Sequence, residues 1–286
     1  MKLIEYKRNS NGVKTRLNKQ LANHGFGCVM CEHDVSEDTL LEISNLLPGH
    51  IFQYGLTDER GITNICSNAK TPGNGYEGSR INKPKPMDWH PDGITAGNLL
   101  GKDDEGNIFL MEMPVTIILQ HVQPAEEGGE NSIFETTPLI EHITTEYPHL
   151  DKFCRDDVHS FARGKHASLN VPLIYTHEDM VESMLWNINY YLKPKDPKLR
   201  DLYKELKFVV DAFIENNPQL VHVIPMQRGL IIYMDNRTCW HSRLAFKGIR
   251  HVRRIQKSGK KVRYVEDNGL LTGCISDYRL HHQAVL

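Results

Sequence analysis

Two histidines and an aspartate are the residues whose types and spacing best fit metal chemistry. His90 and Asp92 stand in the segment WHPDG at 89–93, and His241 ends the segment DNRTCWH at 235–241. Two neutral imidazoles and one carboxylate can occupy one face of an Fe(II) ion and leave three positions for a bidentate cosubstrate and dioxygen. This set therefore predicts a non-haem iron site that suits an oxygenase.

The His-x-Asp spacing is weak on its own, because a chain with 15 histidines in 286 residues should contain about one such pair by chance. Two further pairs occur. The pair at 149–151 lies in a Pro-flanked connection after a predicted helix, and the pair at 177–179 has the pattern of a polar first helical turn. We interpret both as structural. His90 and Asp92 instead follow a Pro-rich loop at 83–86 and lie near the start of a predicted strand, where alternate side chains share a face.

Two arginines downstream of His241 could supply positive charge to an anionic ligand. An apolar strand is predicted at 228–236, and a later strand has Arg250 and Arg254 on one face. A guanidinium that points into an apolar barrel needs an anionic partner, because an unpaired buried charge is strongly unfavourable. A dicarboxylate cosubstrate would be such a partner.

In order and spacing, these pieces resemble the taurine dioxygenase and clavaminate synthase-like group of Fe(II)/2-oxoglutarate-dependent oxygenases. The resemblance covers a little over half of the chain and fails over roughly 146–215. The matching segments are LANHGFGCV at 21–29, the helix-like stretch 35–47, WHPDG at 89–93, GGENS at 128–132 and RGLIIYMDNRTCWHSR at 228–243.

The resemblance implies that His90, Asp92 and His241 bind Fe(II). The implied reaction consumes dioxygen, converts 2-oxoglutarate to succinate and carbon dioxide, and oxidises an unactivated C–H bond of a bound small molecule. The metal would supply the oxidising chemistry, while the protein supplies geometry and excludes water. Related halogenases have a small residue at the carboxylate position, so Asp92 predicts hydroxylation rather than chlorination. Desaturation and ring closure stay open.

The resemblance also implies a cosubstrate site. Arg250 would pair with the distal carboxylate of 2-oxoglutarate, and Arg254 would assist it or meet the substrate. The group commonly has a Thr after the Gly-Gly-acid turn that touches the same carboxylate, whereas this chain has Asn131 followed by Ser132. An amide or a hydroxyl could still donate a hydrogen bond there.

The pattern of elements predicts a mostly β chain with added helices (α+β), built on a double-stranded β-helix, or jelly-roll, core. Short β-like runs at 107–111 and 115–122 lie between Gly, Asp, Asn and Pro residues, as is typical of a closed or sandwiched sheet. Apolar residues at helical spacing predict a helix from Val13 to a stop signal at 24–25. A capping-type pair at positions 34 and 37 is expected to open the next helix.

We expect one oxygenase domain over 1–286, with a helical insert at about 146–215 that is a candidate for a substrate-covering lid. Within the insert, helices are predicted at 181–192 and 198–216. Its aromatic residues are interpreted as packing residues: Trp186, Tyr190 and Tyr191.

Composition and charge favour a small-molecule enzyme. Basic and acidic residues nearly balance, at 34 and 36, which argues against a strongly polyanionic partner. The first residues show no apolar leader, no stretch approaches the ~20 apolar residues of a membrane span, and the six cysteines lack a disulfide framework. The prediction is a cytoplasmic protein with structural thiols. A small polar metabolite such as a free amino acid would suit the charged residues expected near the iron: Arg80, Asp88, Arg243 and Arg254.

Two other functions were weighed. The segment 247–263 holds eight Lys or Arg residues, which could contact nucleic acid or a protein. Part of this charge alternates along a predicted strand and 257–261 has the pattern of a solvated hairpin, so we do not expect nucleic-acid binding. The other alternative is a metal-binding jelly-roll without catalysis, or one that uses another metal and no cosubstrate. His281 and His282 are interpreted as a solvated tail, and the sequence predicts no oligomeric state.

Overall fold

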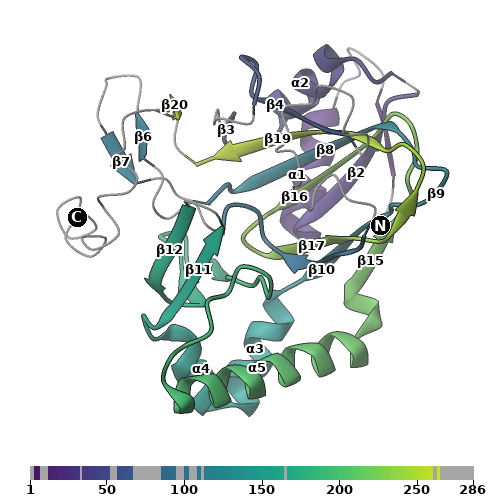
Figure 1. Ribbon diagram of the computed structural model, residues 1–286. Coiled ribbons are helices and arrows are strands. Elements are labelled where there is room, and N and C mark those ends of the chain that lie inside the picture. The colour runs from purple at the N-terminus through teal and green to yellow at the C-terminus, as the bar shows by residue number, and fades with distance from the viewer. Residues whose placement is uncertain are drawn as a thin grey trace.

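Two β-sheets lie face to face in the computed structural model, and helices cover the outer face of each sheet (Figure 1). The structure describes residues 3–6, 12–32, 34–51, 57–66, 85–94, 100–102, 108–110, 113–163, 166–259 and 263–264. Some predictions concern residues outside this part of the chain, namely Arg80, His281, His282, one of the six cysteines (Cys274), positions 83–84 of the Pro-rich loop and positions 260–261 of the expected hairpin.

The larger sheet has the strand order β1-β2-β16-β8-β19-β3, and β4 also pairs with β19. β1 runs parallel to β2, and the other pairs in this sheet are antiparallel. The strands predicted at 115–122, at 228–236 and around Arg254 are confirmed here. The strands of this sheet are β1 (Ile4–Glu5), β2 (Phe26–Met30), β3 (His50–Ile51), β4 (Ile62–Cys66), β8 (Thr116–Gln123), β16 (Leu230–Asp235) and β19 (His251–Ser258).

The smaller sheet is antiparallel, with the strand order β15-β10-β17-β5. Alternate residues of both sheets meet in an apolar core, among them Ile232 of β16, Ile133 of β10 and Cys239 of β17. This core fixes the distance between the sheets at the place where the candidate site lies. The strands of this sheet are β5 (Met87–His90), β10 (Asn131–Glu135), β15 (Val221–Ile224) and β17 (Cys239–Arg243).

Short strands form the remaining pairings among the described residues. They are β6 (Leu100–Lys102) with β7 (Ile108–Leu110) and β20 (Arg263–Tyr264), β9 (Glu127–Gly128) with β18 (Phe246–Lys247), β11 (His159–Arg163) with β12 (His166–Val171), and β13 (Ile174–Thr176) with β14 (Glu182–Met184).

Helices α1 (Val13–His24) and α2 (Glu37–Leu46) cover the outer face of the larger sheet. Their apolar faces pack on outward residues of β16, which explains why β16 is buried on both sides. α1 ends at Gly25 in the left-handed conformation, as predicted. The prediction that a capping pair at 34 and 37 opens α2 is wrong. The side chain of Ser36 caps α2 instead, by accepting a hydrogen bond from the backbone N–H of Thr39.

The outer face of the smaller sheet carries a second layer, made of α3 (Thr137–Glu146), α4 (Pro148–Arg155), α5 (Pro197–Asn216) and the hairpins β11-β12 and β13-β14. A short 3-10 helix, Pro218–Leu220, follows α5. Phe134 and Trp240 from the sheet join residues of these helices in one core. Trp240 stacks on Trp186, with ring centroids 5.7 Å apart, and donates a hydrogen bond from Nε1 to the Met184 carbonyl at 2.8 Å. This layer therefore packs firmly on the sheet that carries the site.

Three local predictions in this layer need correction. The segment 181–192 is not a helix: it forms β14 and then turns, because the backbone N–H of Leu185 bonds to the Leu173 carbonyl at 2.7 Å and extends the hairpin. Residues 177–179 lie at the turn of that hairpin, and 149–151 lie inside α4. The continuous buried run at 183–187 cannot be assigned to helix or strand by periodicity alone. The helix at 198–216 is confirmed as α5.

None of the helices in the described ranges is long and apolar enough to cross a membrane. The described cysteines are free thiols, and Cys28 and Cys31 are buried in and next to β2. Burial raises the pKa of each of these two thiols to about 12, so both stay protonated at neutral pH. They fit the structural role predicted for them.

Candidate metal centre

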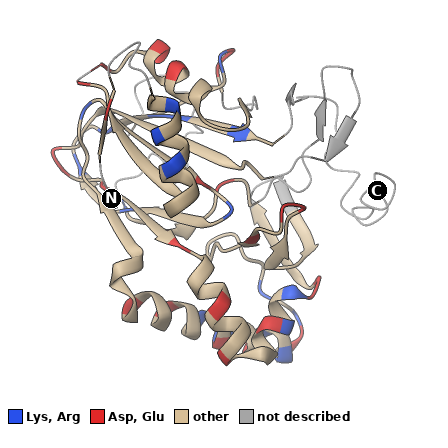
Figure 2. Ribbon diagram, turned by 180° about the vertical axis from the view of Figure 1, so that it is seen from behind, with Lys and Arg blue, Asp and Glu red and all other residues tan. Residues whose placement is uncertain are grey.

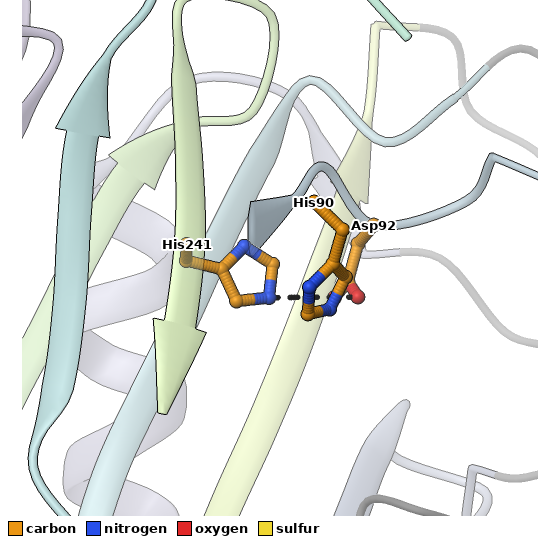
Figure 3. Close-up of side chains that lie close together, drawn as sticks. All are labelled: His90, Asp92 and His241. Carbon is orange, nitrogen blue, oxygen red and sulfur yellow. Dashed lines mark ion pairs between the residues drawn. The ribbon is translucent and has the colours of Figure 1, made fainter. Parts of the chain in front are cut away.

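The two histidines and the aspartate singled out in the sequence come together at one end of the smaller sheet (Figure 3). His90 is the last residue of β5 and lies directly opposite His241 of β17. One nitrogen of each ring and one oxygen of Asp92 all lie within 4.8 Å of one another, and all three residues are buried. These side chains form a compact set of nitrogen and oxygen ligands.

The position of Asp92 corrects the sequence prediction. β5 ends at His90, so Asp92 lies in the turn after a strand and not near the start of one. The turn depends on Gly93, whose φ of +82° is left-handed and whose Cα faces Pro114; a Cβ there would lie 2.5 Å from Pro114 Cδ. A turn, rather than strand alternation, brings the carboxylate toward His90.

The side chain of Asn236 holds this turn. Its Oδ1 accepts a hydrogen bond from the Asp92 backbone N–H at 2.8 Å, and its Nδ2 donates to the carbonyls of Asp92 at 3.0 Å and Pro114 at 2.8 Å. Asn236 is fully buried, so these groups have no access to water as an alternative partner. Asn236 follows β16, and it thereby ties the larger sheet to the metal-ligand turn.

Both histidines are in the form that a metal requires. His90 Nδ1 lies 2.7 Å from the Asp88 carbonyl, which can only accept, so Nδ1 carries the proton and Nε2 keeps its lone pair. Burial lowers the pKa of His90, and burial together with the nearby His90 ring lowers that of His241 to about 3. Both rings are therefore neutral at physiological pH.

The two carboxylate oxygens of Asp92 have different surroundings. Oδ2 accepts hydrogen bonds from Arg254 Nη1 and Gln256 Nε2, each at 2.8 Å, whereas Oδ1 faces His241 Nε2 at 3.7 Å. Burial would raise the pKa of Asp92, but the charge of Arg254 and the Gln256 hydrogen bond favour the ionised form and hold the pKa at about 2. An ionised oxygen beside two neutral imidazoles fits a divalent metal such as Fe(II).

A pocket opens in front of the ligand cluster, between the two sheets, and every member of the cluster lines it. One part of its wall is apolar and includes Leu119 and Val252. The polar lining includes three arginines: Arg243, Arg250 and Arg254. The pocket can thus accept a ligand that has an apolar middle and anionic groups.

Arg250 precedes β19 and is buried, as expected for a residue that binds an anion inside the fold. Its Nε donates to the Gly129 carbonyl at 3.1 Å and its Nη2 donates to Asn131 Oδ1 at 3.0 Å. Burial lowers its pKa to about 9, which leaves the guanidinium largely charged at neutral pH. Arg250 is therefore a fixed positive group at the wall of the pocket.

The other residues expected at the cosubstrate site divide into two groups. Asn131 borders the pocket beside Arg250. Ser132 is buried but does not line the pocket, because it is the next residue of β10 and its side chain points to the opposite face, where Phe134 lies. Arg254 reaches the pocket and pairs with Asp92 at 2.8 Å, so its contact with cosubstrate or substrate stays a prediction.

The charged residues expected near the metal are only partly brought together. Arg243 is buried in the pocket wall and donates a hydrogen bond from Nη2 to the Lys85 carbonyl at 2.6 Å. Asp88 is exposed and accepts a hydrogen bond from Asn189. Three buried polar residues that support the site were not predicted from the sequence: His121, Asn236 and Gln256. The only signal for them in the sequence is their position, inside an apolar strand or next to the motif that contains His241.

The described part of the basic segment 247–263 is largely occupied within the fold. Arg253 pairs with Glu37, and the buried Lys257 donates two hydrogen bonds at 2.6 Å to carbonyls at the end of α2. Lys247 pairs with Glu127 on the surface. Basic and acidic residues are interspersed on the helices as well (Figure 2). These side chains therefore make contacts within the fold.

Residues 4–256 match the family described as Taurine catabolism dioxygenase TauD, TfdA family. The chain belongs to this family of dioxygenases, which confirms the resemblance seen in the sequence. The match extends across 146–215, beyond the segments that carried the resemblance. A comparison with curated proteins found no match.

Solved structures of similar fold include non-haem iron oxygenases. A variant of the oxygenase OrfP in complex with (3S)-hydroxy-L-Arg is 15% identical, with a TM-score of 0.61 over 88% of this chain and 81% of that one. The PvcB protein of Pseudomonas aeruginosa is 15% identical, with a TM-score of 0.60 over 93% and 90%. An asparagine oxygenase in complex with Fe(II), 2S,3S-3-hydroxyasparagine and succinate is 10% identical, with a TM-score of 0.60 over 87% and 80%. At these identities the likeness shows the fold.

Proposed function

We propose that this dioxygenase uses Fe(II) and 2-oxoglutarate to hydroxylate an unactivated C–H bond of a small polar metabolite, with release of succinate and carbon dioxide. The observation that carries the proposal is the cluster of His90, Asp92 and His241 in a pocket that also holds the buried Arg250. A metal at one end and a fixed guanidinium at the other match the 2-oxo acid and the distal carboxylate of the cosubstrate.

Each protein group has a distinct part in this reaction. The two imidazoles and Asp92 Oδ1 would hold the metal, which when bound supplies the chemistry of dioxygen activation. Arg254 and Gln256 keep Asp92 Oδ2 occupied, so only Oδ1 is directed toward the metal. Arg250 would bind the distal carboxylate and orient the cosubstrate. The apolar wall of the pocket excludes water from the reacting atoms.

The charge of the pocket supports a substrate that carries a carboxylate group. Three arginines face one aspartate there, which leaves an excess of two positive charges before a metal binds. Fe(II) and the 2-oxoglutarate dianion cancel each other, so the excess remains for the substrate. The carboxylate of a free amino acid would pair with one of these arginines, and its ammonium group would lie away from them. The OrfP complex with (3S)-hydroxy-L-Arg and the asparagine oxygenase complex with 2S,3S-3-hydroxyasparagine are compatible with this substrate class.

The two facing sheets support the proposal that the core is a double-stranded β-helix. We also propose that the segment 146–215 covers the substrate side of the enzyme. Its residues share a core with Phe134 and Trp240 of the smaller sheet, which favours a fixed cover over a mobile lid. Within the described part of the chain, this segment contributes no residue to the lining of the pocket. Its contact with substrate would therefore lie at the entrance.

The proposal is tested by measuring succinate formation from 2-oxoglutarate with Fe(II) and a panel of free amino acids. We expect one or a few amino acids to stimulate succinate formation well above the uncoupled rate, with a hydroxylated product of 16 added mass units. His241→Ala should abolish the activity. His177→Ala is the matched control, because His177 belongs to another His-x-Asp pair and its ring contacts Ser183 in the β13-β14 hairpin, outside the pocket lining. Activity that survives His241→Ala would contradict the proposal.

A further inference from the structure

A buried histidine lies behind the cosubstrate end of the pocket. His121 of β8 is fully buried and does not line the pocket itself. Its Nε2 lies 3.1 Å from Asn131 Oδ1, and its Nδ1 lies 3.4 Å from the backbone nitrogen of Gln227. His121 is neither a metal ligand nor a neighbour of one, and the proposed chemistry has no step for it.

The surroundings of His121 determine which of its nitrogens carries the proton. A backbone N–H can only donate, so His121 Nδ1 must accept from Gln227 and must be unprotonated. Nε2 then carries the proton and donates to Asn131 Oδ1. Burial, together with the charge of Arg250, lowers the pKa of His121 to about 3, so the ring stays neutral in any physiological buffer.

The same hydrogen bonds fix the orientation of the Asn131 amide. Its Oδ1 accepts from two donors, His121 Nε2 and Arg250 Nη2. A rotated amide would turn its NH2 group toward both donors, which is a strong penalty for a buried group. The amide nitrogen therefore points away from His121 and Arg250, and it donates to no residue in the described part of the chain.

We propose that His121 is a positioning residue for the cosubstrate: with Arg250 it holds the carbonyl oxygen of Asn131, so that the Asn131 nitrogen is presented to the pocket as a donor for the distal carboxylate of 2-oxoglutarate. The inference rests on the proposed function. It explains how Asn131 can replace the Thr that is common at this position in related enzymes. A hydroxyl can rotate to donate a hydrogen bond, whereas an amide donates in one direction only when its carbonyl oxygen is held. His121 acts through Asn131 and touches no reacting atom.

The first test measures 2-oxoglutarate affinity by calorimetry on the Fe(II)-loaded enzyme under argon. His121→Leu should weaken binding roughly tenfold, the effect of about one charge-assisted hydrogen bond. His121→Gln, whose amide can still donate to Asn131, should bind nearly as wild type does. His159→Leu is the matched control, since His159 is an equally buried histidine that bonds to the Phe153 carbonyl and Tyr191. It should leave the affinity unchanged.

A second ligand locates the effect on the carboxylate. 2-Oxovalerate has the same 2-oxo acid but no distal carboxylate, so His121→Leu should not alter its weaker binding. In an Asn131→Thr background, His121→Leu should hardly change the affinity for 2-oxoglutarate, because a hydroxyl can rotate to donate without support from His121. A double-mutant cycle measures this non-additivity. Equal losses for both ligands, or fully additive effects, would overturn the inference.

A measurement on the wild-type protein keeps the test independent of variant folding. Nitrogen-15 NMR of labelled histidine should show His121 as the neutral form protonated at Nε2, and a proton at Nδ1 would overturn the inference. Failure of the proposed function can be distinguished from failure of this inference. If wild type does not bind 2-oxoglutarate, the cosubstrate site itself is wrong, whereas binding in wild type that His121→Leu leaves intact refutes only the role of His121.

Discussion

Removal of the Asn236 side chain should damage the metal site without touching a metal ligand. Asn236→Ala leaves three buried backbone groups without their partner: the N–H and carbonyl of Asp92 and the carbonyl of Pro114. Each unsatisfied buried group costs about 1–3 kcal/mol, so partial relaxation gives an expected loss of roughly 3–5 kcal/mol in the free energy of unfolding. Because the turn also carries Asp92, we expect Fe(II) affinity to fall by about 10–100-fold.

The assay is urea unfolding of the metal-free protein, followed by tryptophan fluorescence, together with a competition titration of Fe(II) against a coloured chelator. Asn18→Ala is the matched control. Asn18 is a half-buried asparagine whose side chain donates to the carbonyls of Lys14 and Leu46, on α1 and α2 and away from the ligands. It should cost about 1 kcal/mol and leave metal affinity unchanged. If Asn236→Ala loses less than about 1 kcal/mol and binds Fe(II) as wild type does, the turn is not held as described.

Three further predictions concern the pocket and its support. Arg250→Ala should weaken 2-oxoglutarate binding by roughly 100-fold while Fe(II) affinity stays nearly unchanged; a parallel loss of both affinities, measured by calorimetry, would refute its role. Gly93→Ala should lower stability by about 2–4 kcal/mol in urea, because the new Cβ meets Pro114 at 2.5 Å. Burial lowers the pKa of Lys257 from 10.5 to about 8 in the folded state, so the unfolded chain binds more protons between pH 8 and 10.5. Relative to Lys257→Met, wild type should therefore gain up to about 3 kcal/mol as pH rises through that window, and a falling difference would contradict the sign.

The grouping of His90, Asp92 and His241 could be predicted from sequence because their spacing is unusual in combination. His90 and Asp92 alone match a frequent pattern, which also occurs at 149–151 and 177–179, where the side chains bond to other protein groups. The local geometry could not be predicted. The sequence placed Asp92 on a strand, whereas the turn at Gly93 and its contact with Asn236 depend on residues 144 positions apart.

The second layer shows where local patterns fail. α5 has a polar face toward solvent and an apolar face inward, so its period is visible in the sequence. In the stretch 181–192, a run of buried residues at 183–187 packs in the core around Trp240, and the exposed residues gather at the end of the stretch, so no helical alternation is visible. The roles of His121 and Gln256 depend on which partner faces them across the sheets, and that information is carried by the tertiary fold.

The central claim is that this pocket binds Fe(II) and 2-oxoglutarate together, the metal through His90, Asp92 and His241 and the distal carboxylate through Arg250, all of which line it. An anaerobic titration of the metal-free protein with Fe(II) and then 2-oxoglutarate tests it most directly. We predict the visible charge-transfer band of the chelated 2-oxo acid in wild type, its loss in His90→Ala, and its retention in His177→Ala. Iron binding in wild type without that band would contradict the claim.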